Sequence, residues 1–437
     1  MLHALHEAGV KIDIVAGRGI GGIGAVLAAV DGGAHLWEST GMWRSNGATR
    51  LYQWRTTLRA AIWTLGASLA ALMLPLVVLV GAVVAYPVAF VLRVIGFETG
   101  DTVAVGYGRL VDFVFQPTVL PVLLPRGIVI ILLALLVILF TGTMWGFFQA
   151  RARRRARGAF WWSFLGVPLN VTRVREWFKG GLWQMMRGAA RVARPKDDDL
   201  SERYAELLAD NIGQPGFREL ILVAHDVDAR RDLVFALLAE PNRQTFFLRR
   251  VGSEGSSRHL ETMDLAGTER QHAIDAIAAA LSIPVVTEPH LVSFAPDSPW
   301  RGETHRLCDR PDATARLFEE VASAGAEQIV LVSALPEPVG PHRLSAGRRD
   351  ALGRAGENVT AMETAALRDA IRSNDGLFQV IFHIRPTHNP LGPFDFGGCY
   401  DERSDRRQSL AELVDRGYED GFRQFVDGVV GASGELA

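Results

Sequence analysis

Two long stretches without a formal charge most constrain how this chain can fold. One runs from residue 60 to 92 and the other from 127 to 150, and both consist almost entirely of apolar and small side chains. A helix that crosses a bilayer needs about 20 apolar residues. We therefore expect one transmembrane helix in each stretch, the first kinked at Pro75 or Pro87. Together they predict a two-helix hairpin within residues 46–157.

Arginine side chains flank this hairpin on both outer sides. Arg50, Arg55 and Arg59 precede the first stretch, an arginine cluster over 151–157 follows the second, and the connection 93–126 carries few basic residues. Positive charge accumulates on the cytoplasmic side of membrane proteins, so both soluble parts are expected in the cytoplasm. Only three of the 46 basic residues are lysine. This composition suggests a GC-rich bacterial genome and hence a bacterial inner membrane.

A basic segment rich in tryptophan follows over residues 158–200. It contains Trp161, Trp162, Trp177 and Trp183 among arginines. This mixture of aromatic and basic side chains is typical of a helix that lies in the headgroup layer. We expect that placement, and the alternative is a core helix that buries its tryptophans.

The two remaining segments, 1–45 and 201–437, are expected to contain alternating strands and helices. Apolar runs predict strands at 10–17, 219–226, 245–251, 291–294, 328–334 and 377–385. Amphipathic or small-residue patterns predict helices at 22–33, 230–240, 268–282, 314–325, 358–373 and 407–430. Such alternation predicts one α/β domain with a mainly parallel sheet, covered on both faces and interrupted by the hairpin.

The densest motif is a glycine-rich turn between the first strand and the first helix. The run Gly17-Arg18-Gly19-Ile20-Gly21-Gly22 matches G-x-G-x-x-G, a pattern that brings a pyrophosphate to a helix N-terminus. That pattern also includes a second strand that ends in an acid about 20 residues further on. In this chain Glu38 lies at about that distance, but the residues around it do not have a pattern typical of a strand. Dinucleotide binding is therefore one alternative function.

Three blocks of sequence together resemble segments of a known enzyme family. They are LHALHEAG (2–9), IDIVAGRGIGG (12–22), and RLCDRP (306–311) followed by a helix and GAEQIVLVS (325–333). They resemble the patatin-like phospholipase family over residues 1–34 and, more loosely, 201–335. The resemblance implies a patatin-like three-layer fold. It also implies lipid acyl hydrolysis by a Ser–Asp dyad, in which the aspartate takes the proton of the attacking serine.

The chain departs from that family at its functional positions. Gly19 stands where the elbow Gly17-Arg18-Gly19-Ile20-Gly21 should carry its nucleophilic serine, and Asp309-Arg310-Pro311 replaces Asp-Gly-Gly or Asp-Gly-Ala. By the resemblance, Asp309 holds the position of the dyad aspartate. The chain also begins within the helix that should follow the oxyanion loop, so we expect the first strand and that loop to be missing. Two explanations are open. The sequence is a truncated or mis-started reading of a longer protein, or the protein is a degenerate homologue that lost the strand, the loop and the serine together.

Glycine cannot carry an acyl group, so we expect an impaired or inactive hydrolase that binds membrane lipid or phospholipid. Arg18 and Arg310 are the expected contacts for an anionic head group. An active hydrolase would instead need an unrecognised nucleophile, for which Ser333 is one candidate.

Other features point to no further chemistry. His225 lies close to Asp226 and Asp228, as in a metal cluster, but this run is expected to end a strand and begin a capped helix. His290 has too few neighbouring ligands for a metal site, and a net charge of −2 gives no basic field for nucleic acid. No cofactor is indicated, the protein partner is unknown, and the distinctive segment 389–405 has no assigned role.

Overall fold

The computed structural model divides the chain into two compact units. It describes residues 1–45, 47–119, 122, 124–151, 166–248, 258–336, 351–392, 400–401 and 406–430. One unit consists of Met1–Gln53 and Leu169–Ala437, and the other is Trp54–Pro168. The short strands β2 (Gln53–Trp54) and β3 (Leu169–Asn170) lie at the two points where the chain passes between the units.

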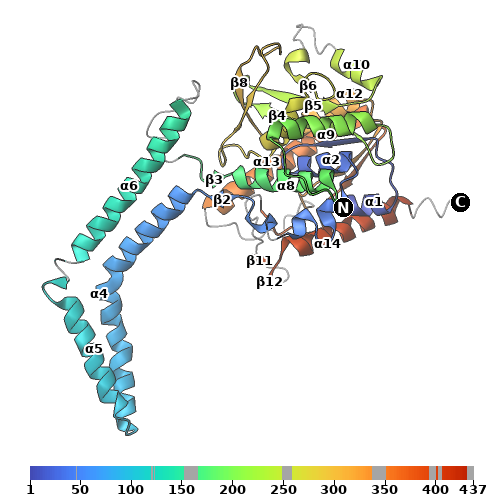
Figure 1. Cartoon of the computed structure of the whole chain (residues 1–437). Coiled ribbons are helices and arrows are strands. Elements are labelled where there is room, and N and C mark those ends of the chain that lie inside the picture. The colour runs from blue at the N-terminus through green and yellow to red at the C-terminus, as the bar shows by residue number, and fades with distance from the viewer. Residues whose placement is uncertain are drawn as a thin grey trace. The chain divides into compact units, whose positions relative to one another are not determined.

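In the described residues, the smaller unit contains three helices (Figure 1). They are α4 (Thr56–Val94), α5 (Thr99–Phe115) and α6 (Leu124–Arg151). Helix α4 and the part Leu124–Gly142 of α6 are long and apolar enough to cross a membrane. This confirms one long apolar helix in each uncharged stretch, and Pro75 and Pro87 both lie inside α4.

Helix α5 is an addition to the expected hairpin, in which residues 93–126 serve as the connection between the two apolar stretches. The Tyr107 hydroxyl in α5 donates to the Val78 carbonyl in α4, and Gly142 of α6 lies against Thr57 at the start of α4. With 39 residues, α4 is about 58 Å long, whereas the hydrocarbon core of a bilayer measures about 30 Å. The two contacts show that the first part of α4 packs on α6 and that its second part packs on α5.

The larger unit is built on a six-stranded sheet in the order β6-β5-β4-β8-β7, with β1 also paired to β4. Its strands are β1 (Ile14–Gly17), β4 (Glu219–Asp226), β5 (Arg231–Leu237), β6 (Thr262–Asp264), β7 (His290–Ser293) and β8 (Thr304–Cys308). Only the β1–β4 and β5–β6 pairs are parallel, whereas β4–β5, β4–β8 and β7–β8 are antiparallel. The sheet is mixed, so the expectation of a mainly parallel sheet was wrong.

Two further parallel strands, β9 (Gln328–Val332) and β10 (Val380–Ile384), form a separate pair. They coincide with the runs expected at 328–334 and 377–385. In the part of the chain that the structure describes, neither β9 nor β10 is hydrogen-bonded to the six-stranded sheet.

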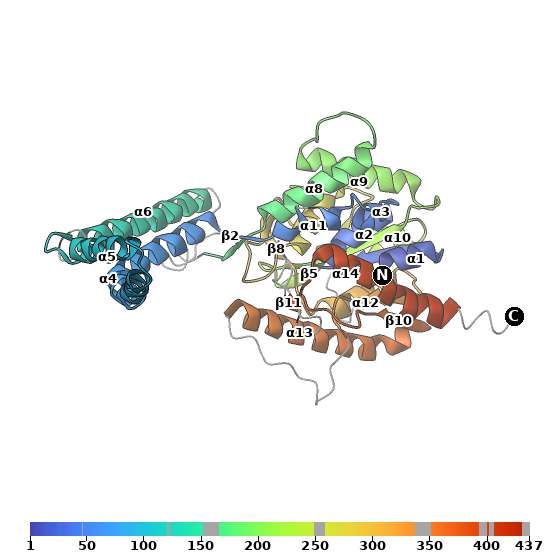
Figure 2. The same cartoon turned by 90° about the horizontal axis from the view of Figure 1, so that it is seen from below.

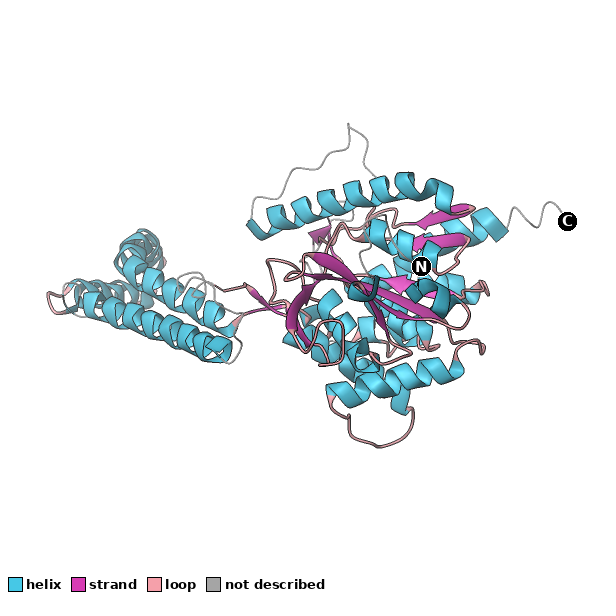
Figure 3. Ribbon diagram, turned by 90° about the horizontal axis from the view of Figure 1, so that it is seen from above, coloured by secondary structure: helices cyan, strands magenta, loops and turns pink. Residues whose placement is uncertain are grey.

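Helices cover both faces of the main sheet (Figure 3). On β4, Leu220 and Leu222 belong to one buried cluster and Ile221 and Val223 to another, as the alternation of side chains along a strand requires. The first cluster includes α2 (Gly21–Ala29), α8 (Thr172–Arg187), α9 (Asp197–Asn211) and α11 (Ala273–Ala280). The second includes α10 (Asn242–Leu248), α12 (Thr314–Ser323) and α13 (Ala351–Asn374). Figure 2 shows α12 and α13 on the side away from α8 and α9.

Two elements after β4 differ from expectation. Residues 230–240, expected as a helix, contain strand β5, and the strand expected at 245–251 falls on helix α10 and on residues outside the described ones. The cause is a tight turn after β4, where the Asp226 carboxylate accepts hydrogen bonds from the main-chain N–H groups of Asp228 and Ala229. A connection this short joins antiparallel strands only.

Helix α8 corrects the headgroup-layer expectation for residues 172–187 of the segment 158–200. Its residues Val174, Phe178, Leu182 and Trp183 are buried in the core of the larger unit. The apolar face is therefore covered by protein, which was the alternative interpretation. Trp161 and Trp162 lie outside the described residues.

The first and last helices of the larger unit pack together. The remaining elements are α1 (Leu2–Glu7), α3 (Ala34–Trp37), α14 (Leu410–Gly421), a π-helix (Phe422–Val430), the strands β11 (Tyr400–Asp401) and β12 (Arg406–Arg407), and short 3-10 turns. The Tyr418 hydroxyl on α14 donates to Glu7 of α1 at 2.6 Å. Of the distinctive segment 389–405, residues 393–399 and 402–405 lie outside the described ones.

Candidate functional site

The glycine-rich turn joins β1 directly to α2. β1 ends at Gly17 and α2 begins at Gly21. A Cβ atom on Gly17 would lie 2.8 Å from the Cα of Gly22, so the strand and the helix approach too closely for any side chain there. Gly19, at the apex, has a φ of +52°. That backbone conformation is uncommon for residues with a side chain.

The apex of this turn faces Asp309. A Cβ atom built on Gly19 would lie 3.0 Å from the Oδ2 atom of Asp309. Asp309 follows β8, and its main-chain N–H donates to the Ser282 carbonyl at 2.8 Å. The structure thus brings together the two positions that the family resemblance assigned to the nucleophile and its base, although they are separated by 290 residues of chain.

Arg18 binds three side chains around the turn. Its Nη1 lies 3.2 Å from Asp309 Oδ2 and its Nη2 lies 3.2 Å from Glu363 Oε1 on α13. Its Nε donates to the Thr314 hydroxyl on α12 at 3.1 Å. The Arg18 side chain is only 17% exposed, so these bonds act in a partly desolvated site, where they are stronger than on the surface.

Burial raises the pKa of the Asp309 carboxyl above its usual value. The Arg18 guanidinium opposes this shift, while the Glu363 carboxylate adds to it. One cation therefore balances two carboxylates, which would otherwise repel each other.

Arg310 is held by a different set of carboxylates. Its Nη2 lies 3.1 Å from Asp232 Oδ2 and its Nε lies 3.0 Å from Asp312 Oδ1. Its main-chain amide donates to the Asp309 carboxylate. Each of the two arginines expected at a head group therefore already has two carboxylate partners.

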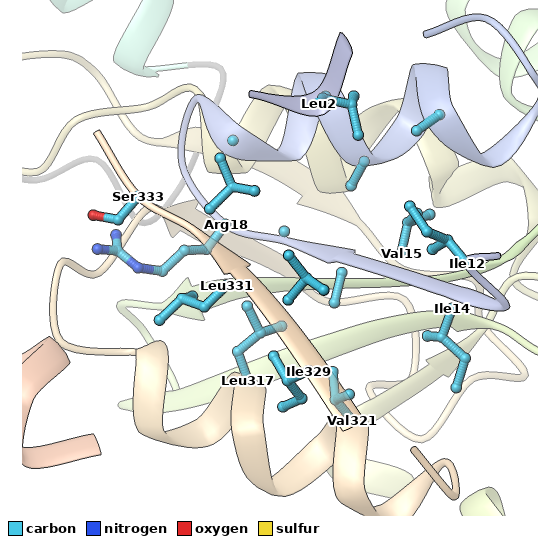
Figure 4. Close-up of a pocket in the computed structure, with 18 of the residues that line it drawn as sticks. Leu2, Ile12, Ile14, Val15, Arg18, Leu317, Val321, Ile329, Leu331 and Ser333 are labelled. Carbon is cyan, nitrogen blue, oxygen red and sulfur yellow. The ribbon is translucent and has the colours of Figure 1, made fainter. Parts of the chain in front are cut away.

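A large cavity lies between β1, β9 and the helices on either side of them, with a volume of about 1800 Å³. Arg18, Gly19, Asp309 and Glu363 line one end of it. Ser333, the candidate alternative nucleophile, lies at the same end as Arg18 (Figure 4). Its hydroxyl accepts a hydrogen bond from the Leu335 main-chain N–H at 3.0 Å.

The arrangement fits a dinucleotide poorly. The strand that runs parallel to β1 is β4, and it ends in an acid, Asp226. That side chain is completely buried and contacts His305, so it is not available to a ribose. At the turn itself, Asp309 and Glu363 place two carboxylates where a pyrophosphate would need positive charge.

Glu363 and Thr314 are contacts of Arg18 that the sequence does not identify. Both lie on amphipathic helices with many polar side chains, and nothing in the sequence distinguishes these two as functional. They come into contact with Arg18 because of the way the chain folds. The described residues contain no group of three or more His, Cys, Asp or Glu that could hold a metal ion.

Comparison with known proteins adds no assignment. The chain matches no protein-family model, no curated protein and no solved structure.

Proposed function

We propose that the chain is a membrane-anchored, patatin-like protein that binds a lipid ester at the β1–α2 turn without hydrolysing it. The observation that supports this is the Gly19–Asp309 relationship. A serine at the apex of this turn would place its side chain against a buried carboxylate, which is the arrangement of a Ser–Asp dyad. The patatin-like three-layer fold is part of the same proposal.

The chemistry stops at binding because the attacking oxygen is absent. In a dyad, the serine oxygen would attack the ester carbonyl while the aspartate accepts its proton, and an acyl-enzyme would form. Gly19 offers no oxygen, and the Asp309 carboxylate is instead bonded to Arg18. A bound ester would therefore lie beside an Asp309 carboxylate that is already paired with Arg18, and no nucleophile would be present at position 19.

Membrane lipid is the proposed ligand. Two apolar helices long enough to span a bilayer would anchor the domain beside its ligand, with both soluble parts in the cytoplasm of a bacterial cell. Arg18 and Arg310 are the proposed head-group contacts, and Arg310 is the more exposed, at 36%. A lipid phosphate would have to displace one of the carboxylates that each arginine now holds.

Photo-crosslinking tests this proposal on the full chain in nanodiscs. The probe is a phosphatidylglycerol with a diazirine in one acyl chain. We expect crosslinks to residues of the turn and no release of fatty acid above that of protein-free discs. Ser333→Trp should remove these crosslinks by filling the turn end of the cavity. Ser373→Trp, on an exposed part of α13, is the matched control and should leave them unchanged. Crosslinks confined to α4 and α6, or release of fatty acid, would overturn the proposal.

A further inference from the structure

The connection between α11 and β7 carries an exposed valine in an unusual backbone conformation. Val285 is 90% exposed and has a φ of +68°. It follows Pro284 in a turn, and a positive φ after a proline in a turn is normally adopted by glycine or asparagine. For a β-branched side chain this conformation is strained. Residues 281–287 are called the Val285 loop below.

The packing of the larger unit does not explain this residue. Because its side chain is almost fully exposed, it contributes little to the apolar core. The loop around it is nevertheless well held, since the Thr287 N–H and the Thr287 hydroxyl both donate to the Ile283 carbonyl at 3.0 Å. A fixed loop therefore presents an apolar side chain to its surroundings in a strained conformation. Strain of this kind is found most often at functional sites.

The Val285 loop is bonded to both places where the chain passes out of the larger unit. The first part of that unit ends at Gln53, and the second part begins at Leu169. One residue before Gln53, the Tyr52 hydroxyl donates to the Leu281 carbonyl at 2.7 Å. The Leu169 N–H donates to the Val286 carbonyl at 3.1 Å. The two crossing points thus hold the two ends of this loop.

The first crossing point is close along the chain to an apolar helix. Helix α4, which is long and apolar enough to span a bilayer, begins at Thr56. The three residues from Gln53 to Thr56 cover at most about 11 Å, and this limit holds for any orientation of the two units. Where α4 enters the bilayer, as proposed above, the Val285 loop is therefore held within reach of the headgroup layer.

Exposed side chains beside the crossing points suit contact with lipid headgroups. Arg50 and Arg173 are exposed, and they lie two residues before Tyr52 and four residues after Leu169. Trp54 is exposed as well. Basic side chains are attracted to anionic lipids, and tryptophan is enriched where a membrane meets water. The surroundings of the loop thus combine the basic, aromatic and apolar groups of an interfacial surface.

The base of the Val285 loop is attached to the β1–α2 turn through Asp309. The Ser282 carbonyl accepts from the Asp309 N–H at 2.8 Å, and the Ser282 hydroxyl accepts from Arg175 Nη2 at 2.6 Å. Ser282 is completely buried. The loop is therefore fixed to the residue that faces Gly19, so the position of the loop in a lipid layer would also determine the position of the turn.

We infer that the Val285 loop inserts its tip into the lipid bilayer and holds the β1–α2 turn at the membrane surface. The inference rests on the membrane anchoring proposed above, and adds a lipid contact made by the larger unit itself. Lipid is the surface that this loop meets, because the loop is bonded to both crossing points and has basic and aromatic side chains beside it. The burial of a single valine is a modest gain. The loop therefore orients a domain that α4 and α6 already anchor.

Fluorescence quenching of the full chain in nanodiscs tests the inference. In a background with Cys308→Ala and Cys399→Ser, Val285→Cys carries an environment-sensitive NBD group. The discs contain phosphatidylcholine and phosphatidylglycerol, with or without a nitroxide near the top of one acyl chain. We expect the nitroxide lipid to remove at least about half of the emission, because an interfacial segment reaches about 5–10 Å into the boundary between headgroups and acyl chains.

Two further NBD positions in the same background are the matched controls. Leu65→Cys, on an exposed side of α4, should be quenched, as membrane anchoring requires. Leu377 is also exposed, and it lies before β10 at the start of the β9–β10 pair. Arg18 lies at the opposite end of β9 (Figure 4). Leu377→Cys should keep its emission in the presence of the nitroxide lipid.

A glycine variant separates lipid contact from a role in folding. Val285→Gly removes a side chain that packs against little, and glycine adopts a positive φ without strain. We expect its melting temperature in detergent to equal or exceed that of the unmodified chain.

Four outcomes would overturn the inference. They are an unquenched label at 285 beside a quenched label at 65, a blue-shifted label at 285 that the nitroxide lipid does not reach, equal quenching at 377 and 285, and a lower melting temperature of Val285→Gly. If the label at 65 is not quenched either, the membrane anchoring fails as well. Lipid crosslinking at the turn is a separate measurement, so its absence beside quenching at 285 would refute the proposed ligand and leave this inference standing.

Discussion

The Oδ2 atom of Asp309 lies 3.0 Å from the point where a side chain on Gly19 would begin. Any residue other than glycine at this apex would therefore meet a buried carboxylate with its first side-chain carbon. Gly19 also has a positive φ. The turn therefore places a backbone conformation that favours glycine directly beside the Asp309 carboxylate. Glycine adopts this backbone without strain, whereas a side chain at this position would introduce strain. The close packing of β1 against α2 holds the turn in place.

Removal of Arg18 should destabilise the protein in a pH-dependent way. Arg18→Met leaves Asp309 and Glu363 as facing carboxylates and should cost on the order of 3 kcal/mol near neutral pH. The pKa of Asp309 is already raised by burial and should rise further without Arg18. The native state then binds its proton more tightly than the unfolded state, so stability falls as pH rises from about 4 through the raised pKa.

The melting temperature at pH 5 and pH 8 checks this prediction. The deficit of Arg18→Met against the unmodified chain should be larger at pH 8. Arg18→Lys keeps one positive charge and should show a smaller deficit at both values. A deficit that is independent of pH would mean that Arg18 does not balance these carboxylates.

A second buried ion pair should behave differently. Arg258 and Glu320 are 3% and 2% exposed, and the Arg258 guanidinium lies 4.3 Å from the centre of the Phe246 ring. Arg258→Met alone leaves Arg316 to pair with Glu320 and should cost about 3 kcal/mol. The double variant Arg258→Met/Glu320→Leu should recover part of this loss, because it removes both buried charges. Thermal unfolding measures both, and a double variant less stable than the single one would refute the prediction.

The proposed topology predicts which engineered cysteines react from outside the cell. In a background with Cys308→Ala and Cys399→Ser, Thr118→Cys lies between the two apolar helices and should react with a membrane-impermeant maleimide in intact cells. Asp210→Cys, on the exposed side of α9, should react only after permeabilisation. The opposite labelling pattern would reverse the assigned orientation.

Strand β4 shows what can be predicted from the sequence. The predicted strand has the limits that the structure shows, because an uninterrupted apolar run fits a strand buried on both faces. The helices at 314–325 and 358–373 are similarly evident from their amphipathic pattern. The glycine spacing of the turn, together with the family resemblance, singles out Gly19 and Asp309 from the amino-acid sequence alone.

Strand β5 shows where the sequence is insufficient. Residues 233–237 carry apolar side chains at consecutive positions, and periodicity alone cannot distinguish such a run from a buried helix. The deciding feature is the Asp226 side chain, which caps the tight turn before β5. The contribution of Glu363 is not predictable either, because it depends on how α13 packs beside the turn, 345 residues along the chain from Arg18.

Fluorophosphonate labelling of the full chain in detergent tests the central claim most directly, because this reagent modifies activated serines. We predict no labelling of the unmodified chain. Gly19→Ser should be labelled at residue 19, and Asp309→Asn should abolish that labelling. Gly21→Ser is the matched control, since a side chain there would meet nothing within 4 Å, and it should stay unlabelled. Labelling of the unmodified chain, at Ser333 or any other serine, would contradict the proposal that the turn binds its ligand without hydrolysing it.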